Sequence, residues 1–447
     1  MQLRSALTIT LALAACGPNG DTTDTTDGTD TTDTTDDTDT LDTTNTPPGP
    51  SPTDAECVEE NGACILEGTY TESMRLTSDK AWLLRGKVQI GDDGSATTLT
   101  IQAGTTVYGE AASNAFLVIA RGAKIMAEGT ASSPIVFTSD QPEGTRARGD
   151  WGGVAINGYG LINGCAAGVD PCEAEGEGGT GTYGGNDNAD NSGVMRYVRI
   201  QFGGTEISID NEINGLGLQG VGSGTVLDHI QIHRNTDDGI EFWGGAVNAS
   251  HILVTDAGDD GIDWDFGWTG KLQYAIVDQA DDAGNNGTEC DNNEANHLAT
   301  PVSSPWISNV TFLGSEAIAE DNFGMLFRRG AAPNYSNIAV TGFTKACLSI
   351  RDTATIDNFS SGAASLERVM MDCATAFEDA DEEPIFNAGS GNELVNDLGL
   401  VGWLPDGASP LLGAGQAPSD PWFEATTFVG AIGTDDWTTG WTNTDAD

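Results

Sequence analysis

The runs His229-Ile230-Gln231-Ile232 and Asp237-Asp238-Gly239-Ile240-Glu241-Phe242 return, in the same order and at one common interval, as His251-Ile252-Leu253-Val254 and Asp259-Asp260-Gly261-Ile262-Asp263-Trp264. Each copy joins a short β-type run to an acidic turn with glycine, and neither has the apolar spacing of a helix. A repeat of roughly 20–30 residues built from short strands is typical of a β-solenoid. Because no single coil can bury its own apolar face, stacked coils must share one continuous core.

Further repeats flank this pair on both sides. A third copy begins with Tyr274-Ala275-Ile276 and Asp281-Asp282 at about the same interval, and Ser308-Asn309-Val310 returns after a longer one as Ser336-Asn337-Ile338. Earlier, three β-type triplets follow one another at a shorter, even spacing: Leu99-Thr100-Ile101, Leu117-Val118-Ile119 and Ile135-Val136-Phe137. The variable spacing predicts an all-β, single-stranded right-handed parallel β-helix with loops of different length. A left-handed hexapeptide helix does not fit the later spacings, and a propeller blade needs about 40 residues.

The composition restricts the kinds of partner. The chain has 447 residues, with 18 Lys and Arg against 68 Asp and Glu, a formal net charge of −50, and 59 Gly. Such a balance excludes nucleic-acid binding, which needs basic residues against phosphate, and also docking onto anionic lipid through a basic face. A divalent cation, a basic protein or a neutral polymer remains compatible with the charge.

The N-terminus reads as an export signal. Residues 1–15 combine Arg4 with an uncharged apolar stretch that is too short to span a bilayer. The stretch ends in Leu13-Ala14-Ala15-Cys16, which resembles a bacterial lipobox and implies that Cys16 is the lipid-modified first residue of the mature chain. By the same resemblance, Gly17 after the cysteine favours the outer membrane or cell surface over retention in the inner membrane. The alternative is an ordinary secretory signal followed by a chance cysteine.

The rest of the chain divides by composition. Residues 16–55 carry the lipidated cysteine and a tract of Thr and Asp, whose repeated like charge predicts a disordered tether. We expect an N-terminal cap with a disulfide at 56–80, the β-helix at 81–442 and a short tail at 443–447.

The cysteines are expected to form disulfides, because an exported protein meets an oxidising compartment. Cys57 with Cys64 and Cys165 with Cys172 would each close a short loop, and the lack of nearby histidine argues against zinc. One further pair is expected among the remaining cysteines, without a basis for choosing it. These are Cys290, Cys347 and Cys373.

Several segments resemble a known family. The run from Leu117 to Thr130 and the runs 134–139, 149–153, 191–199 and 437–442 are similar to the coils of secreted, pectin-lyase-like parallel β-helix proteins. The matches cover most of residues 80–442. Many members of this group are uncharacterised surface lipoproteins of Gram-negative bacteria, so the resemblance implies an architecture and a location more than a reaction.

The repeated Asp-Asp-Gly turn is the main candidate site. Equivalent residues of stacked coils lie about 4.8 Å apart, so Asp237, Asp259 and Asp281 are expected in one column. A second column would hold Asp238, Asp260 and Asp282. Carboxylates at this spacing must be solvated, hold protons or bind a cation, and calcium suits such oxygens. The hypothetical calcium ligands are Asp237, Asp238, Glu241, Asp259, Asp260 and Asp263. The competing interpretation is a column of Asp residues that only stabilise turns.

A catalytic alternative uses the same acids. Asn235-Thr236-Asp237 and Asp259-Asp260 resemble parts of the pattern of pectin-lyase-like hydrolases, in which Asp237, Asp259 and Asp260 would be catalytic. The Gly-His-Gly and Arg-Ile-Lys parts of that pattern are missing. A polysaccharide lyase would need a basic residue near calcium, and the candidates are Lys271, Arg328 and Arg329. We therefore favour a non-enzymatic binding module for calcium, a glycan or a surface protein over a lyase or glycoside hydrolase.

Aromatic residues gather around the repeated coils. Most of the set Phe242, Trp243, Trp264, Phe266 and Trp268 is expected to stack in the interior. Trp243 and Trp268 fall outside the aligned pair and are expected to be exposed, where they could stack on sugar rings. His229 and His251 are expected to stack without forming a metal site, and Arg148-Gly149-Asp150 is not expected to act as an adhesion signal.

Overall fold

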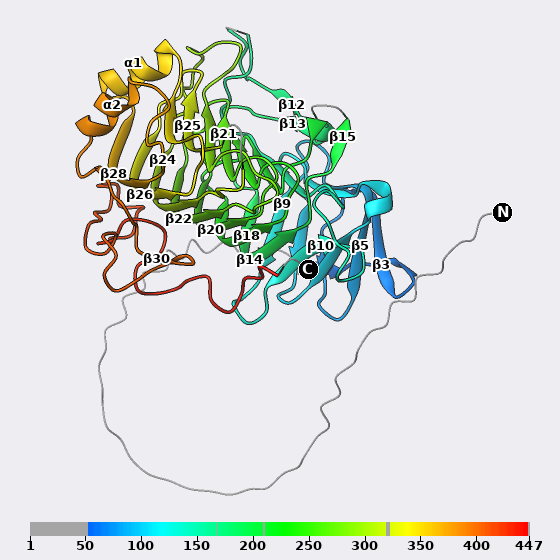
Figure 1. The fold of residues 1–447 in the computed structure, drawn as a ribbon. Helices are drawn as coiled ribbons and strands as arrows, with labels where there is room; N and C mark the ends of the chain where they lie inside the picture. Colours follow the sequence, from blue (N-terminus) through cyan, green and yellow to red (C-terminus); the bar gives the residue numbers. More distant parts are fainter. Residues whose placement is uncertain (1–51, 167, 209–210, 319–321, 446–447) are drawn as a thin grey trace, which may run out of the picture. The chain divides into compact units, whose positions relative to one another are not determined.

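The structure is a computed structural model that describes residues 52–166, 168–208, 211–318 and 322–445. The predicted signal peptide, Cys16 and nearly all of the predicted tether lie outside these ranges. Twenty-five strands form one continuous sheet in which all pairs except β2–β3 are parallel, and the sheet winds around the core coil by coil (Figure 1). The prediction of a parallel β-helix is confirmed.

The long strands of the central coils occupy one column of the stack. They are β14 (Gly193–Gln201), β18 (Val226–His233), β20 (Asn248–Thr255), β22 (Lys271–Asp278), β24 (Trp306–Leu313), β26 (Asn334–Thr341) and β28 (Ser365–Asp372). Ile230 pairs with Ile252, and Val310 pairs with Ile338, so both repeats read from the sequence are confirmed as neighbouring coils.

A residue in the left-handed conformation bends each long strand in its middle. These residues form a column with φ between 49° and 63°: Tyr197, His229, His251, Tyr274, Asn309, Asn337 and Arg368. The ladder of paired residues skips each of them, so that each strand contributes to two faces of the coil. Non-glycine residues rarely adopt this conformation, which costs about 1–2 kcal/mol each. Its recurrence at the same position of seven successive strands shows that it forms a regular corner of the coil.

Short strands form the third face. They are β8 (Phe116–Ile119), β11 (Val154–Asn157), β17 (Leu216–Gln219), β19 (Ile240–Trp243), β21 (Ile262–Asp265), β23 (Thr288–Asp291), β25 (Phe323–Arg328) and β27 (Ala346–Ile350). Their inward residues include the column Phe242, Trp264, Cys290 and Phe327, all buried in the core.

The first coils contain more residues than the even spacing of the three triplets suggested. They contain β1 (Thr53–Asp54), β2 (Val58–Glu60), β3 (Ala63–Tyr70), β4 (Met74–Leu76), β5 (Ala81–Ile90), β6 (Thr98–Ile101), β7 (Thr106–Gly109), η1 (Ala111–Ser113), β9 (Lys124–Glu128) and β10 (Ile135–Ser139). Leu99 pairs with Ile125, Leu117 with Val88, and Phe137 with Val107. The evenly spaced triplets therefore lie on three different faces, and their interval is not the length of a coil.

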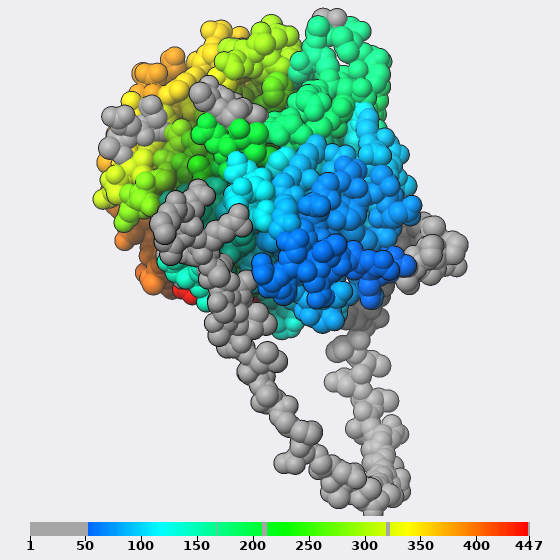
Figure 2. Space-filling model, turned by 90° about the vertical axis from the view of Figure 1, so that its right-hand side faces the viewer, coloured from blue at the N-terminus to red at the C-terminus, as the bar shows by residue number. Residues whose placement is uncertain are grey.

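An inserted segment and the C-terminal region lie outside the coils. The insert follows β11 and contains β12 (Ala174–Gly176), η2 (Glu177–Gly179) and β13 (Gly181–Tyr183), and a hairpin of β15 (Glu206–Ser208) and β16 (Asn211–Glu212) follows β14. Figure 2 shows the first coils in blue, with the blue-green insert above them. Figure 1 shows α1 (Thr353–Ser361) and α2 (Glu382–Ala388) at the opposite end.

The parallel ladder ends at β29 (Glu393–Leu394). The predicted limits of 81 and 442 thus differ from those of the paired strands, which run from β1 to β29. Residues 395–445 contain the hairpin of β30 (Leu400–Val401) and β31 (Leu404–Pro405) and then return along the long strands as a strap. Figure 1 draws this strap in orange to red beside strands β28 to β14.

Three disulfides form among the described residues. Cys57–Cys64 and Cys165–Cys172 form as predicted. The further pair is Cys347–Cys373, and Cys290 stays free and buried in the interior. No helix among the described residues is long and apolar enough to cross a membrane.

Candidate functional site

The candidate site is the outer face of the short strands β19, β21 and β23. Alternation along each strand sends Ile240 and Phe242 into the core and their neighbours outward. The register then places Glu241, Asp263 and Glu289 in one outward column. Two positions further along the strands, Asp265 and Asp291 follow in a parallel column on β21 and β23. Three consecutive coils therefore present carboxylates on one face.

The aspartates of the preceding turns link these coils. The backbone N–H of Asp260 donates to Oδ1 of Asp238 (2.9 Å), and that of Asn286 donates to Oδ1 of Asp260 (2.6 Å). Asp238 and Asp260 are buried, at 7 % and 3 % exposure, whereas Asp259 is exposed. One oxygen of each buried carboxylate thus stabilises the next turn. Both carboxylates also belong to the acidic face, which we define as the outward carboxylates of β19, β21 and β23 together with the aspartates of the turns before them.

The third copy of the turn differs from the prediction. Ile262 pairs with Thr288, so that Asn286 follows Asp238 and Asp260 in the column. The loop after β22 is longer than its predecessors, and it carries Asp281 and Asp282 away from the column. Asp282 instead accepts hydrogen bonds from both terminal nitrogens of Arg148 (3.0 and 3.1 Å), and Asp281 accepts one from Ser315. The prediction that Asp281 and Asp282 extend the two columns is wrong.

The remaining predicted ligands do come together. Carboxylate oxygens lie within 4.8 Å of one another in three overlapping groups: Asp237 with Asp238 and Asp259, Asp238 with Glu241 and Asp263, and Asp260 with Asp263 and Glu289. These groups contain all six residues proposed from the sequence. Glu289 was missed, because its alignment with Asp263 requires the longer loop of the third coil.

Burial and mutual repulsion shift the acids strongly. Burial first, and then the neighbouring carboxylates, raise the pKa of Asp237 to about 7. The same causes raise the pKa values of Asp238, Glu241, Asp260 and Asp263 well above their ordinary range. Two carboxylates at about 4.8 Å would repel by about 3.5 kcal/mol at an effective dielectric of 20. The face therefore has to hold protons or a cation.

Two arginines neutralise one end of the face. Nε of Arg328 donates to Asp291 (2.9 Å), and its Nη2 contacts Glu289. Arg329 donates to the other oxygen of Asp291 (2.5 Å). The pKa of Glu289 is still raised to about 7, because burial outweighs the effect of Arg328. The charged neighbours with the largest effects on Asp238, Glu241, Asp260 and Asp263 are all carboxylates.

A buried amide borders the end of the face that lacks arginine. Asn214 is 1 % exposed, and its Nδ2 donates to Oε2 of Glu241 (2.5 Å). Its carbonyl oxygen Oδ1 has no hydrogen-bond partner among the described residues, and neither does Oδ1 of Asp265. A buried acceptor without a partner costs about 1–3 kcal/mol, and a bound cation would remove this cost.

The inserted segment covers part of the face. Glu177 of η2 lies over it, and burial followed by Asp237 and Glu212 raises the pKa of Glu177 to about 7. Arg121 of the coils binds the insert through Glu173 (2.5 Å) and the carbonyl oxygen of Gly184 (2.7 Å). Asp93, also of the coils, accepts from its Nε (2.7 Å). The acidic face is thus partly closed to water by a segment that is fixed in place.

The aromatic predictions divide in two. Phe242 and Trp264 are buried as expected. Trp243 is only 8 % exposed, because it packs beneath Ile162 and Tyr183 of the insert, and Trp268 is fully buried against Phe242 with ring centroids 4.0 Å apart. The prediction that Trp243 and Trp268 are exposed is wrong, and neither is available for stacking on a sugar.

The histidine pair is structural. His229 and His251 stack with ring centroids 4.2 Å apart and an interplanar angle of 18°. Both Nδ1 atoms approach the same Oδ1 of Asp228, at 3.0 and 2.8 Å. A metal bonded to both rings at about 2.0–2.1 Å would have to lie far from both ring planes. The two histidines are therefore not oriented to share an ion.

Other sequence candidates lie elsewhere. Lys271 pairs with Asp420 of the strap (2.6 Å) on a different face. Arg148 donates hydrogen bonds to Asp282 and to the carbonyl oxygen of Asp256 (2.8 Å), and Asp150 accepts one from Ser139 (2.6 Å). The tripeptide Arg148-Gly149-Asp150 is therefore part of the packing between coils.

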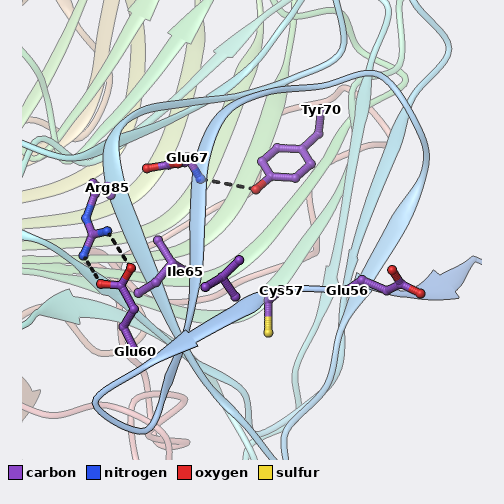
Figure 3. A pocket seen from close by; sticks show the side chains of 8 residues that line it. Glu56, Cys57, Glu60, Ile65, Glu67, Tyr70 and Arg85 are labelled. Carbon is purple, nitrogen blue, oxygen red and sulfur yellow. Dashed lines mark hydrogen bonds and ion pairs between the residues drawn. The ribbon is translucent and has the colours of Figure 1, made fainter.

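Two hollows lie at the ends of the coil stack, away from the acidic face. The first, about 530 Å³, is lined by β2, β3 and β5 and is shown in Figure 3. Arg85 there pairs with Glu60 (3.1 Å), and the N–H of Glu67 donates to the hydroxyl of Tyr70 (3.2 Å). The second, about 450 Å³, lies between α1, α2 and β28. The Arg85–Glu60 pair shows that the basic group of the first hollow is already neutralised within it.

Residues 68–400 match the family described as the pectate-lyase-like β-helix domain. The chain belongs to this family. The match covers most of the described coils and all of the acidic face, so the family resemblance read from the sequence is confirmed. No curated protein and no solved structure matches the chain significantly.

Proposed function

We propose that this member of the family is a non-enzymatic, lipid-anchored binding module of the outer membrane or cell surface, and that its acidic face takes up calcium. The observation that carries the calcium proposal is the set of three overlapping carboxylate groups, which includes the buried Asp238, Glu241 and Asp260. Unpartnered oxygens of Asn214 and Asp265 border this set. Calcium accepts several carboxylate and carbonyl oxygens in flexible geometry, whereas magnesium demands octahedral geometry and sheds water reluctantly.

Thermal unfolding of the purified mature protein tests this proposal. Calcium at one hundred times its dissociation constant should stabilise the fold by about 2.7 kcal/mol, since it binds only the native state. Magnesium at equal ionic strength should stabilise it less. Asp263→Asn should remove most of the calcium effect, because Asp263 belongs to two of the three groups. Asp357→Asn on the exposed side of α1 is the matched control and should leave the effect intact.

Equal responses to the two ions, unchanged in Asp263→Asn, would contradict a calcium site. Such a result would mean that the ions act only by screening the net charge. The aspartates of the turns would then have the structural role supported by the hydrogen bonds that Asp238 and Asp260 accept from the backbone N–H groups of Asp260 and Asn286.

The competing function is a polysaccharide lyase or glycoside hydrolase. It is favoured by one observation, the position of Arg328 and Arg329 at the end of the carboxylate columns. The hydrogen bonds of Arg328 to Asp291 and Glu289 oppose it, because they hold the guanidinium in a charge pair. Screening against acidic and neutral polysaccharides separates the two functions. Chain cleavage that is lost in Asp260→Asn would overturn the non-enzymatic proposal.

The membrane anchor is proposed from the export signal and the lipobox-like stretch that ends in Cys16. Cys16→Ser should release the exported protein from membranes without changing its unfolding temperature, because the lipid chains would be lost and the coils would be untouched. Detergent phase partitioning of both forms measures this. Continued partitioning of the processed variant into detergent would show that another feature anchors the chain.

A further inference from the structure

Trp306 is an exception among the aromatic residues. All Phe, Tyr and Trp residues of the sequence lie within the described ranges, and Trp306 alone among them has an exposed side chain, with 41 % of its surface accessible. The other tryptophans are buried or half-buried. The indole is therefore left in water on a fold that otherwise covers its rings.

Polar side chains flank this indole along the stack. Trp306 begins β24, and it pairs with Lys271 on the preceding coil and Asn334 on the following one. Its neighbour Ile307 is buried in the core, so alternation directs Trp306 outward. Lys271 is held by Asp420 (2.6 Å), and Oδ1 of Asn334 accepts from Ser365 (3.0 Å). The backbones of Lys271 and Asn334 thus lie about 4.8 Å to either side of that of Trp306. The amide of Asn334 also donates to the carbonyl oxygen of Ala332 (3.4 Å), so that its second N–H and the other N–H groups of Lys271 can still donate to a ligand.

The surroundings select a class of ligand. The net charge of −50 opposes nucleic acids and acidic polysaccharides. A protein partner would use an apolar patch around the tryptophan, because energetically dominant interface residues sit at the centre of a water-excluding rim. None of the other exposed large apolar residues is paired with Trp306 in the sheet. An exposed indole whose partners in the sheet are polar instead suits a sugar ring, which has an apolar C–H face and polar hydroxyl edges.

We propose that Trp306 is the stacking platform of a site for neutral oligosaccharides, with Lys271 and Asn334 donating hydrogen bonds to hydroxyl groups. The site lies on the column of long strands, whereas the proposed calcium ligands lie on the short strands β19, β21 and β23 and in the turns before them. Sugar binding at Trp306 is therefore independent of calcium, and the two proposals can fail separately.

Calorimetric titration of the full mature protein tests this site. The probes are neutral hexasaccharides of β-linked glucose, galactose and mannose, each with calcium and with EDTA. We expect at least one of them to bind in both conditions. Trp306→Ala should weaken that binding at least about tenfold, the effect of about 1.4 kcal/mol, and Trp306→Phe should restore part of it. Leu298→Ala, at another exposed apolar residue, should bind like the unchanged protein.

Two results would overturn the proposal. If none of the three hexasaccharides binds the unchanged protein, Trp306 is not a platform for neutral sugars. If a sugar binds but Trp306→Ala retains the affinity, the platform is elsewhere, and loss of that binding in EDTA would place it on the acidic face. Far-UV circular dichroism of Trp306→Ala confirms that the comparison is between folded proteins.

Discussion

At the scale of single residues, the left-handed column shows how the sequence secures a corner of the fold. The side chains at these positions face outward, and several of them hold the strap. Asn309 donates to the carbonyl oxygens of Phe428 and Gly430 (3.0 and 3.1 Å), and Asn337 donates to that of Gln416 (2.9 Å). The contacts offset the cost of the strained backbone, which explains why the positions are not simply glycine.

Asp228 is the residue of this corner with the clearest expected effect. Its Oδ1 lies 3.0 Å from Nδ1 of His229 and 2.8 Å from Nδ1 of His251. The same oxygen accepts a hydrogen bond from the hydroxyl of Ser250 (2.9 Å). Burial opposes ionisation, but the interactions with the two histidines outweigh it and lower the pKa of Asp228. Asp228→Asn should therefore lower the free energy of unfolding by about 1–3 kcal/mol at pH 6. Because the folded pKa is depressed, this stabilisation exists above pH ~4 and is lost as the pH falls further.

Denaturant unfolding at pH 6 and pH 3 measures this difference. Glu367→Gln is the matched control, since Glu367 has the equivalent place in the last long strand but is 51 % exposed, and it should change stability by less than about 0.5 kcal/mol. Equal losses at both pH values for Asp228→Asn would show that charge is not involved.

The same scale explains what could be predicted about the site. Asp237, Asp238, Glu241, Asp259, Asp260 and Asp263 come from two coils of equal length, so the sequence repeat is also the spatial register. Glu289 could not be aligned without knowing that the next loop is longer. Trp243 was misjudged because its cover, Ile162 and Tyr183, comes from an insert far away in the sequence.

At the scale of elements, strands were predictable and the irregular segments were not. Strands of a solenoid repeat a local pattern of apolar residues, and each packs on its neighbours in the stack. The strap has no such repeat. It is held by side chains of several different coils, such as Gln231, which exchanges hydrogen bonds with the backbone of Asn443 (2.8 and 2.6 Å). Its placement is therefore a tertiary property that no local pattern encodes.

The end of the strap should contribute measurable stability. Trp441 is 2 % exposed and lies edge-on to Tyr197 and His229, and Trp437 lies edge-on to His251. Deleting residues 436–447 should lower the free energy of unfolding by at least about 1.5–3 kcal/mol, the contribution of one large buried side chain. The coils should keep their circular dichroism spectrum. A deletion of residues 446–447 alone is the control, and an unchanged unfolding midpoint in the longer deletion would show that the strap only rests on the coils.

At the scale of the whole molecule, the chain combines a large negative charge with a partly buried acidic face. Most proteins place acids in solvent, where each is screened. Here three coils bring carboxylates together under an insert, and arginines neutralise only one end of the face. The fold must therefore bind protons or cations at this face to remain stable, and its stability should depend on both.

This dependence gives a prediction with a definite sign. In the folded protein the pKa values of Asp237, Glu177 and Glu289 are raised to about 7, whereas unfolded carboxyl groups titrate near pH ~4. Between these values the folded state holds more protons, so the free energy of unfolding in EDTA should fall as the pH rises from about 4 to about 7. Each such proton contributes up to about 1.4 kcal/mol per pH unit.

Asp237→Asn should flatten the slope, because it removes one proton site and also removes the repulsion that raises the pKa of Glu177. The control Asp357→Asn, which changes the net charge equally, should not flatten it. Parallel curves for all three proteins would mean that general charge repulsion, and not the acidic face, sets the pH dependence. If the face does set it, saturating calcium at pH 7 should restore the stability lost in EDTA, since the cation takes over the role of the protons.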